Sequence, residues 1–371
     1  MPKKRIGELD LLRFVFMMVV LLYHFETGTF PFGNIGVEFF FILSGLLMAR
    51  HAEKWEKTTD GGGRDLTLVA NEAWSFLRGK FRSFYTYYLV AFGFNVIVRS
   101  IIINRAAAAS VAMRLLKSIP TVTLSFFAFS EKTTSYYIYA TWYLSAMLIA
   151  MLVLYPILLR NYRVGVKIVF PILIIILLGY EYASKERVSL ISDWMSFTYF
   201  GILRAGSEIA LGAVIYNVST EITGNEALMK RAGRRFNQAL LTLGKVICFG
   251  VVLLYAHQTG FGLKFAKSFD LHALMLCGVG ILLSFSGLGW SIPDCKLTRY
   301  LAKISVPIYI FHKLLRVTWL EAMGVDEVSA KTNWMMVIVC MAASVALMYV
   351  TDFLARGIQK LRASQEKQLA E

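Results

Sequence analysis

The sequence has few charged residues, few prolines and no closely paired cysteines. Only 17% of its 371 residues are charged, whereas about a quarter are charged in a soluble domain. Seven prolines and no polar low-complexity segment argue against a string of linked domains. Because no CxxC pair occurs, we expect neither a disulfide framework nor a zinc site. HExxH, GxSxG and DxD patterns are also absent, which disfavours a metalloprotease, a lipase and a metal-dependent glycosyltransferase.

Long apolar runs are abundant instead. The chain is 57% hydrophobic with a mean hydropathy of +0.58, and the runs 168–179 and 334–350 contain no charge. A membrane-spanning helix needs about 20 mostly apolar residues. We therefore predict an all-α, polytopic membrane bundle of about ten transmembrane helices in a single domain, 1–371. The predicted spans are 9–26, 33–50, 84–103, 142–160, 168–183, 197–217, 240–256, 271–288, 303–321 and 334–355.

The basic residues predict the orientation. With the N-terminus in the cytoplasm, about 24 of the 39 Lys and Arg fall on the cytoplasmic side and about nine in outer loops, as the positive-inside rule expects. Both termini are then cytoplasmic, with a basic cytoplasmic loop at 51–83 and a cytoplasmic tail at 356–371. The net charge of +15 is explained by topology and by contact with membrane lipids, so we expect no nucleic-acid partner.

The connection 104–141 is too long for a simple outer loop. Its apolar, aromatic stretches TVTLSFFAF and SYYIYATWY predict a helix that lies at the outer interface or dips into it, where irregular backbone needs protein or a cavity beside it. Plain interfacial anchoring by Tyr and Trp explains the same residues equally well.

The first predicted span carries three ionisable residues, Asp10, Arg13 and His24. Such groups cost free energy in a membrane, face the protein interior and usually mark function. On a helix that turns about 100° per residue, Arg13 and His24 lie about 20° apart around the axis, and Asp10 about 60° from Arg13. His24 also lies about 16 Å further along the helix than Arg13. We therefore expect Arg13 and His24 to face one crevice.

Each of these residues also has a structural interpretation. Asp10 and Arg13 fit an ion pair at a helix start, with the Arg13 side chain reaching toward water. His24 fits an interfacial histidine near an outer helix end. A catalytic role for His24 is favoured by its chemistry, because histidine is the side chain best matched to taking a proton from a hydroxyl near neutral pH.

Two later spans carry ionisable residues as well. Arg204 and Glu208 lie one helical turn apart, and Gly212 continues the same stripe. The pair fits mutual neutralisation between helices, and it also fits binding of an anionic donor or orientation of the catalytic histidine. His312 alone is more typical of a polar contact between helices than of a base.

Basic and aromatic residues alternate at the end of the 51–83 segment. Arg78, Lys80 and Arg82 stand among aromatic side chains in RGKFRSFYTYY. Coenzyme A offers a 3′-phosphate, a pyrophosphate and an adenine, for which arginines and aromatic faces are fitting partners. The same charges are also explained as determinants of topology.

Six motifs, in order along the chain, resemble those of the bacterial membrane acyltransferase family three. They are R-x-x-x-LD-x-LR with a following His, G-x-x-GV-x-FF-x-x-SG, R-x-x-P-x-Y, W-x-L, R-x-x-x-E/F-x-x-x-G and LGxxSYxIYLxH. The matching residues are Arg5, Leu9, Asp10, Leu12, Arg13, His24, Gly33, Gly36, Val37, Phe39, Phe40, Ser44, Gly45, Arg82, Tyr87, Trp142, Leu144, Arg204, Glu208, Gly212, Ser305, Tyr309 and His312. The third motif departs from the pattern, because Tyr85 replaces its proline and Gly79 stands where a second arginine is frequent.

This resemblance implies a stand-alone O-acyltransferase of ten helices in the inner (cytoplasmic) membrane, without an added SGNH-type hydrolase domain. It would move an acyl group, usually acetyl, from cytoplasmic acyl-CoA to a hydroxyl of a cell-surface or lipid-linked glycan, with no permanently bound cofactor or metal. We expect His24 to act as general base or acyl carrier, and Asp10 or Glu208 to hold its tautomer or to position Arg13. The catalytic residues expected are His24, Arg13 and Asp10. The donor-binding residues expected are Arg78, Lys80, Arg82 and Arg204. The supporting residues expected are Glu38, Trp142, Ser145, Glu208, Ser305 and His312.

A transporter or flippase of a lipid-linked or anionic substrate is the alternative. Ten spans and buried charges suit that class, but the sequence shows no internal repeat of the kind many transporters have. A catalytically inactive scaffold is a further possibility, and the presence of Arg13 and His24 argues against it.

Overall fold

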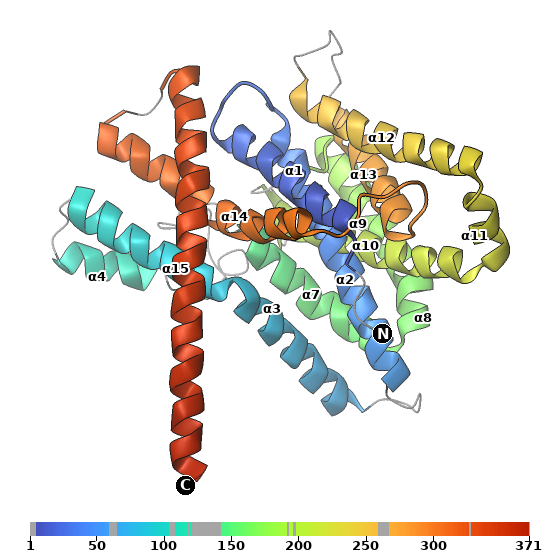
Figure 1. Ribbon diagram of the computed structural model, residues 1–371, viewed down its shortest axis with the longest axis horizontal. Coiled ribbons are helices and arrows are strands. Elements are labelled where there is room, and N and C mark those ends of the chain that lie inside the picture. The colour runs from blue at the N-terminus through green and yellow to red at the C-terminus, as the bar shows by residue number, and fades with distance from the viewer. Residues whose placement is uncertain are drawn as a thin grey trace.

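The structure, a computed structural model, is a bundle of long helices (Figure 1). It describes residues 5–58, 65–103, 108–117, 119, 123, 142–190, 193–195, 198–258, 267–325 and 328–370. The helices are α1 (Gly7–His24), η1 (Gly33–Ile35), α2 (Gly36–Thr58), α3 (Leu66–Phe94), η2 (Asn95–Ile103), α4 (Ala108–Lys117), α7 (Trp142–Arg160), α8 (Tyr162–Val164), η4 (Gly165–Val169), α9 (Phe170–Lys185), α10 (Phe200–Gly224), α11 (Glu226–Ala232), α12 (Arg235–His257), η5 (Lys267–Phe269), α13 (Asp270–Phe285), α14 (Lys296–Met323) and α15 (Ala330–Ala370). The strands β1 (Trp194–Met195) and β2 (Thr198–Tyr199) pair antiparallel.

The predicted all-α membrane architecture is confirmed. Each of the ten predicted spans overlaps a helix or a run of consecutive helices. Five helical segments of the described chain are long and apolar enough to cross a membrane by length and composition. They are Gly33–Thr58, Trp142–Arg160, Tyr162–Lys185, Arg235–His257 and Ala330–Gly357. The count of ten spans and the cytoplasmic placement of both termini stay predictions.

The segment predicted as a cytoplasmic loop, 51–83, is largely helical. α2 continues to Thr58, and α3 begins at Leu66 instead of at the predicted position 84. Ala, Glu, Lys and Arg are good helix formers, and they extend both helices beyond their apolar parts. In the same way α15 continues past its predicted end at 355 and forms one long helix, whose C-terminal end lies away from the rest of the bundle (Figure 1).

The long connection 104–141 is described only in part. α4 (Ala108–Lys117) shows that it contains a short helix. The two aromatic stretches on which the interfacial prediction depends fall almost entirely outside the described residues, so that prediction is not tested.

α2 and α10 lie in close contact at the centre of the bundle. A Cβ atom added at Gly45 would lie 1.9 Å from the carbonyl oxygen of Ile209, and one added at Gly212 would lie 1.9 Å from that of Ile42. Small residues allow such close approach of membrane helices. The glycines of the second and fifth motifs therefore set the distance between these two helices.

α1 packs along α14 and also contacts α2 and η1. The glycines of the second motif again permit the approach, because a Cβ at Gly33 would lie 2.6 Å from the Val19 carbonyl oxygen and one at Gly36 2.9 Å from that of Phe16. Figure 1 shows α1 and α14 side by side, which places two motifs from opposite ends of the chain together.

Candidate functional site

Two histidines from different helices face each other inside the bundle. His24 is the last residue of α1, and His312 lies within α14. Their ring centroids are 5.0 Å apart, and the ring planes are inclined by 35°. His312 is completely buried, whereas His24 is partly exposed. The structure thus brings the predicted base together with a residue that was predicted only to support it.

The hydrogen bonds of His312 determine where its proton lies. Its Nδ1 lies 2.7 Å from the carbonyl oxygen of Tyr309 and 3.2 Å from that of Ile308. A carbonyl oxygen can only accept, so Nδ1 carries the hydrogen and Nε2 of the neutral ring is an acceptor. Nε2 is buried and has no hydrogen-bond partner in the part of the chain that the structure describes.

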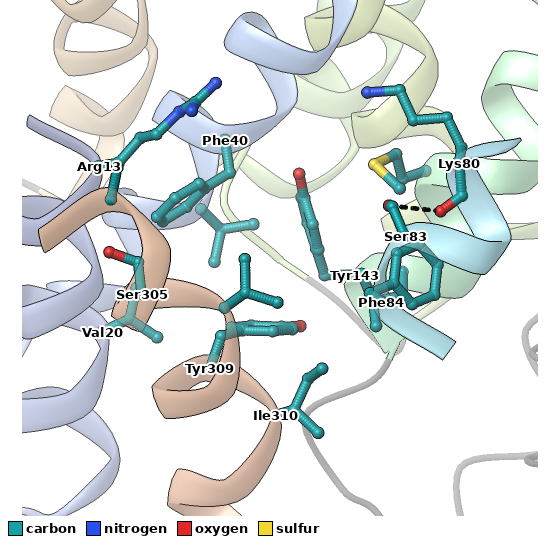
Figure 2. A pocket seen from close by; sticks show the side chains of 15 residues that line it. Arg13, Val20, Phe40, Lys80, Ser83, Phe84, Tyr143, Ser305, Tyr309 and Ile310 are labelled. Atoms are coloured by element: carbon teal, nitrogen blue, oxygen red, sulfur yellow. Dashed lines mark hydrogen bonds between the residues drawn. The ribbon is translucent and has the colours of Figure 1, made fainter. Parts of the chain in front are cut away.

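A cavity of about 220 Å³ lies between α1, α2, α3, α7 and α14. Most of its wall is apolar, and its charged side chains are Arg13 from α1 and Lys80 from α3. Figure 2 shows these two cations on opposite walls near one end, with Tyr309 and Ile310 near the other. The arrangement suits a ligand with an anionic end and a longer, weakly polar arm.

Tyr309 connects the cavity with the histidine pair. Its side chain lines the cavity, and its ring centroid lies 5.6 Å from that of Tyr143 and 5.9 Å from that of His312. His24 and His312 themselves are not among the lining residues. The predicted crevice is therefore present in part: Arg13 faces the cavity, and His24 lies beside His312, next to the wall that Tyr309 forms.

Asp10 positions Arg13 and does not contact His24. Its Oδ1 accepts a hydrogen bond of 3.2 Å from Nη1 of Arg13, and its Oδ2 accepts one of 3.0 Å from Nε of Arg5. The side chain of Arg13 is 29% exposed and still lines the cavity. The ion pair expected at the start of the first helix is thus present, and it holds Arg13 at the cavity wall.

Only one of the three basic residues of α3 reaches the cavity. Lys80 lines it, with Nζ lying 5.9 Å from the centre of the Phe76 ring. Arg78 and Arg82 are exposed and do not line it. The reason is helical geometry. Arg78 and Arg82 are four residues apart and share one face of the helix, whereas Lys80, midway between them, points to the opposite side. Of the three residues that we expect to bind the donor, Lys80 lines the cavity and the two arginines do not.

Arg204 is fully enclosed and is not placed to bind a donor. Its Nε donates to Glu38 at 3.0 Å and to Glu208 at 3.2 Å, and its Nη2 also donates to Glu38. Its remaining N–H groups point at backbone carbonyls of Asn34, Ser189 and Leu190. With no N–H group left for a phosphate, the predicted donor-binding role of Arg204 is not supported. Glu208 serves this cluster and does not orient His24.

The predicted supporting residues do not form one cluster. Trp142 joins Glu38 and Glu208 in the Arg204 cluster, with its ring centre 5.5 Å from the guanidinium carbon. Ser305 lies at the cavity wall and donates to the Leu301 carbonyl at 2.9 Å. Ser145 is buried, and its hydroxyl has no partner among the described residues.

Two polar features of the structure have no role among the sequence-based predictions. Tyr143 lines the cavity and its hydroxyl lies 3.1 Å from that of Ser44; both residues stand within the motifs but carried no assigned role. Glu181 of α9 is completely buried, and neither of its carboxylate oxygens has a hydrogen-bond partner in the described chain. The sequence contains a signal for Glu181, because an acidic residue within an apolar run is costly in a membrane and usually marks function.

The sequence matches one family model, described as an acyltransferase domain, over residues 6–353. The match includes the cavity, the histidine pair and the Arg204 cluster. No curated protein and no solved structure matches the chain. Because the match covers nearly the whole sequence, the chain belongs to this membrane acyltransferase family, the one that its six motifs resemble.

Proposed function

We propose that this acyltransferase moves an acyl group, acetyl in the simplest case, from cytoplasmic acyl-CoA to a hydroxyl of a cell-surface or lipid-linked glycan. Its place of action would be the inner (cytoplasmic) membrane of a bacterial cell. The observation that carries the proposal is the cavity, in which Arg13 and Lys80 stand at one end of a mostly apolar space beside the histidine pair.

The two cations would bind the phosphates of the donor. Hydrogen bonds between cationic side chains and phosphate oxygens are about twice as strong as those between neutral groups. Arg13 offers a planar fork of donors, and Lys80 a compact charge on a flexible stem. The structure gives Lys80 no ion pair with a described carboxylate, which leaves its charge available for a phosphate. The pantetheine arm would then extend along the apolar wall toward Tyr309.

His24 would act as the general base at the acceptor hydroxyl. Its imidazole takes the hydroxyl proton as the oxygen attacks the thioester carbonyl carbon. A carbon–oxygen bond forms, the carbon–sulfur bond breaks, and the departing CoA thiolate takes up the proton that His24 holds. General-base catalysis of this kind contributes a factor of about 10²–10⁴ to the rate.

The test is a comparison of surface glycans from cells with and without this protein, by mass spectrometry. We expect a fixed acyl increment on a saccharide in cells that contain the protein and its loss in cells that lack it. Identical glycan masses in cells with and without the protein would contradict the proposal. A change in glycan sidedness without a change in mass would instead point to a flippase.

A further inference from the structure

His312 has a buried acceptor whose presence the fold alone does not explain. Nε2 of this ring has no partner among the described residues, and leaving a buried polar atom unpaired costs free energy. An apolar side chain of similar size in α14 would avoid that cost. An unpaired buried polar group therefore needs an explanation, such as a catalytic role.

The orientation of the His312 ring is fixed by its other nitrogen. Nδ1 donates to the Tyr309 carbonyl at 2.7 Å and lies 3.2 Å from the Ile308 carbonyl, both within the same helix. These bonds hold the ring in one orientation and keep the hydrogen on Nδ1. The lone pair of Nε2 is therefore available to a hydrogen-bond donor from a neighbouring side chain.

His24 is the titratable ring beside this acceptor. The two ring centroids lie 5.0 Å apart, and rotation of the His24 side chain alone can bring one of its ring nitrogens to the usual hydrogen-bond distance of about 2.9 Å from Nε2 of His312. The structure gives the His24 ring no hydrogen bond to any described residue. Asp10 and Glu208 were predicted to hold the tautomer of His24 or to position Arg13. They bind Arg13 and Arg204, and neither is hydrogen-bonded to His24.

We propose that His312 is the positioning residue of the catalytic base: its Nε2 accepts a hydrogen bond from one nitrogen of His24. The other nitrogen of His24 is then deprotonated and directed at the acceptor hydroxyl. When His24 takes the hydroxyl proton, the same hydrogen bond stabilises the resulting imidazolium. A third group that orients the base is a general feature of such sites. This inference rests on the proposed role of His24 as base.

The charged groups around the pair do not supply such an acceptor. Lys313 and Arg316 of α14 are cations and can only donate. Glu26 follows α1, and its carboxylate pairs with Arg316 at 2.8 Å.

Two substitutions separate a positioning role from a structural one. In His312→Asn the amide NH₂ can still donate to the carbonyls that Nδ1 now binds, but the shorter side chain has no atom at the place of Nε2. In His312→Gln the longer side chain can present its oxygen near that place. Both side chains are polar and of similar size, so differences in packing between the two variants are small.

The assay uses the full chain in inverted membrane vesicles from cells that make the glycan, with radiolabelled acetyl-CoA as the donor probe. Rates are expressed per amount of folded protein, measured by size-exclusion chromatography. We expect His312→Asn to lower kcat about tenfold or more, a part of the factor that a general base supplies. The KM for acetyl-CoA should change less than about twofold, because the donor phosphates bind elsewhere. His312→Gln should recover much of the lost kcat.

A control histidine stands on α13. His272 is exposed and its ring stacks on Phe269 at 5.2 Å, away from the cavity lining. His272→Gln should leave kcat and KM unchanged. Wild-type kcat in His312→Asn, equal losses in the Asn and Gln variants, or a loss expressed in KM alone would each overturn the inference.

The variant His24→Ala separates this inference from the proposed function. If His24→Ala is inactive while His312→Asn is fully active, His24 remains the proposed base and only the positioning role of His312 fails. If His24→Ala retains wild-type activity, the proposed role of His24 fails first.

Discussion

The contact between α2 and α10 makes a quantitative prediction for Gly212→Ala. The added Cβ would lie 1.9 Å from the Ile42 carbonyl oxygen, whereas close carbon–oxygen contacts are about 3.3 Å. Relieving the clash requires a separation of the two helices by roughly 1.4 Å at this point. The neighbouring hydrogen bond from Arg204 of α10 to Glu38 of α2, now 3.0 Å long, would then exceed hydrogen-bond distance. The bond from Arg204 to Glu208 lies within α10 and would not lengthen.

The expected cost follows from these two effects. Overpacking of a close contact costs about 1–3 kcal/mol, and weakening a buried ion cluster adds to it. We expect Gly212→Ala to lower the free energy of unfolding by about 3 kcal/mol. The same argument applies to Gly45→Ala, whose Cβ would lie 1.9 Å from the Ile209 carbonyl oxygen.

Thermal unfolding of the purified protein in detergent measures this loss. Gly250→Ala is the matched control, because a Cβ added at Gly250 in α12 meets no atom within 4 Å. This control should be neutral or slightly stabilising, since Ala is favoured over Gly in a helix by about 1 kcal/mol. Equal melting temperatures for the Gly212 and Gly250 variants would refute the close-contact argument.

Three further predictions concern individual side chains. Lys80→Ala should raise the KM for acetyl-CoA about tenfold, because a hydrogen bond to a charged group contributes about 1.5–3 kcal/mol. Arg82→Ala should change this KM much less, and initial rates measured against acetyl-CoA concentration distinguish the two variants. Arg204→Leu should destabilise the fold by about 3–5 kcal/mol, because it leaves Glu38 without its buried partner, and the melting temperature should rise again when Glu38→Gln is added. Asp10→Asn should change the melting temperature little, since partly exposed ion pairs contribute about 0–1 kcal/mol. It should raise the KM for acetyl-CoA, because the Arg13 side chain is no longer held at the cavity wall. An unchanged KM would show that Asp10 does not position Arg13.

The helices could be predicted from the sequence because apolar runs of sufficient length have few alternatives in a membrane. Their ends could not. Hydropathy detects the apolar part of α3 but not its start at Leu66, where charged and polar residues belong to the same helix. Because residues 78–82 belong to this helix, Lys80 lies on the face opposite Arg78 and Arg82, and Lys80 lines the cavity while the two arginines do not.

The candidate site was predictable in its members and not in its pairings. Each ionisable residue in a span could be recognised from its apolar neighbours. Which partner it meets depends on helix packing, so the contact of Arg204 with Glu38 of α2 and that of His24 with His312 of α14 carry no local signal. Arg204 illustrates the consequence, because a buried cation resembles an anion-binding residue until its own carboxylates are found.

The most direct test of the central claim is the acyl transfer rate of His24→Ala in membrane vesicles with radiolabelled acetyl-CoA. The His272→Gln variant serves as the control for a histidine outside the site. Because a general base contributes about 10²–10⁴-fold, the account predicts a loss of at least about 100-fold in transferred label at unchanged amounts of folded protein. Transfer by His24→Ala at the rate of the control would contradict it.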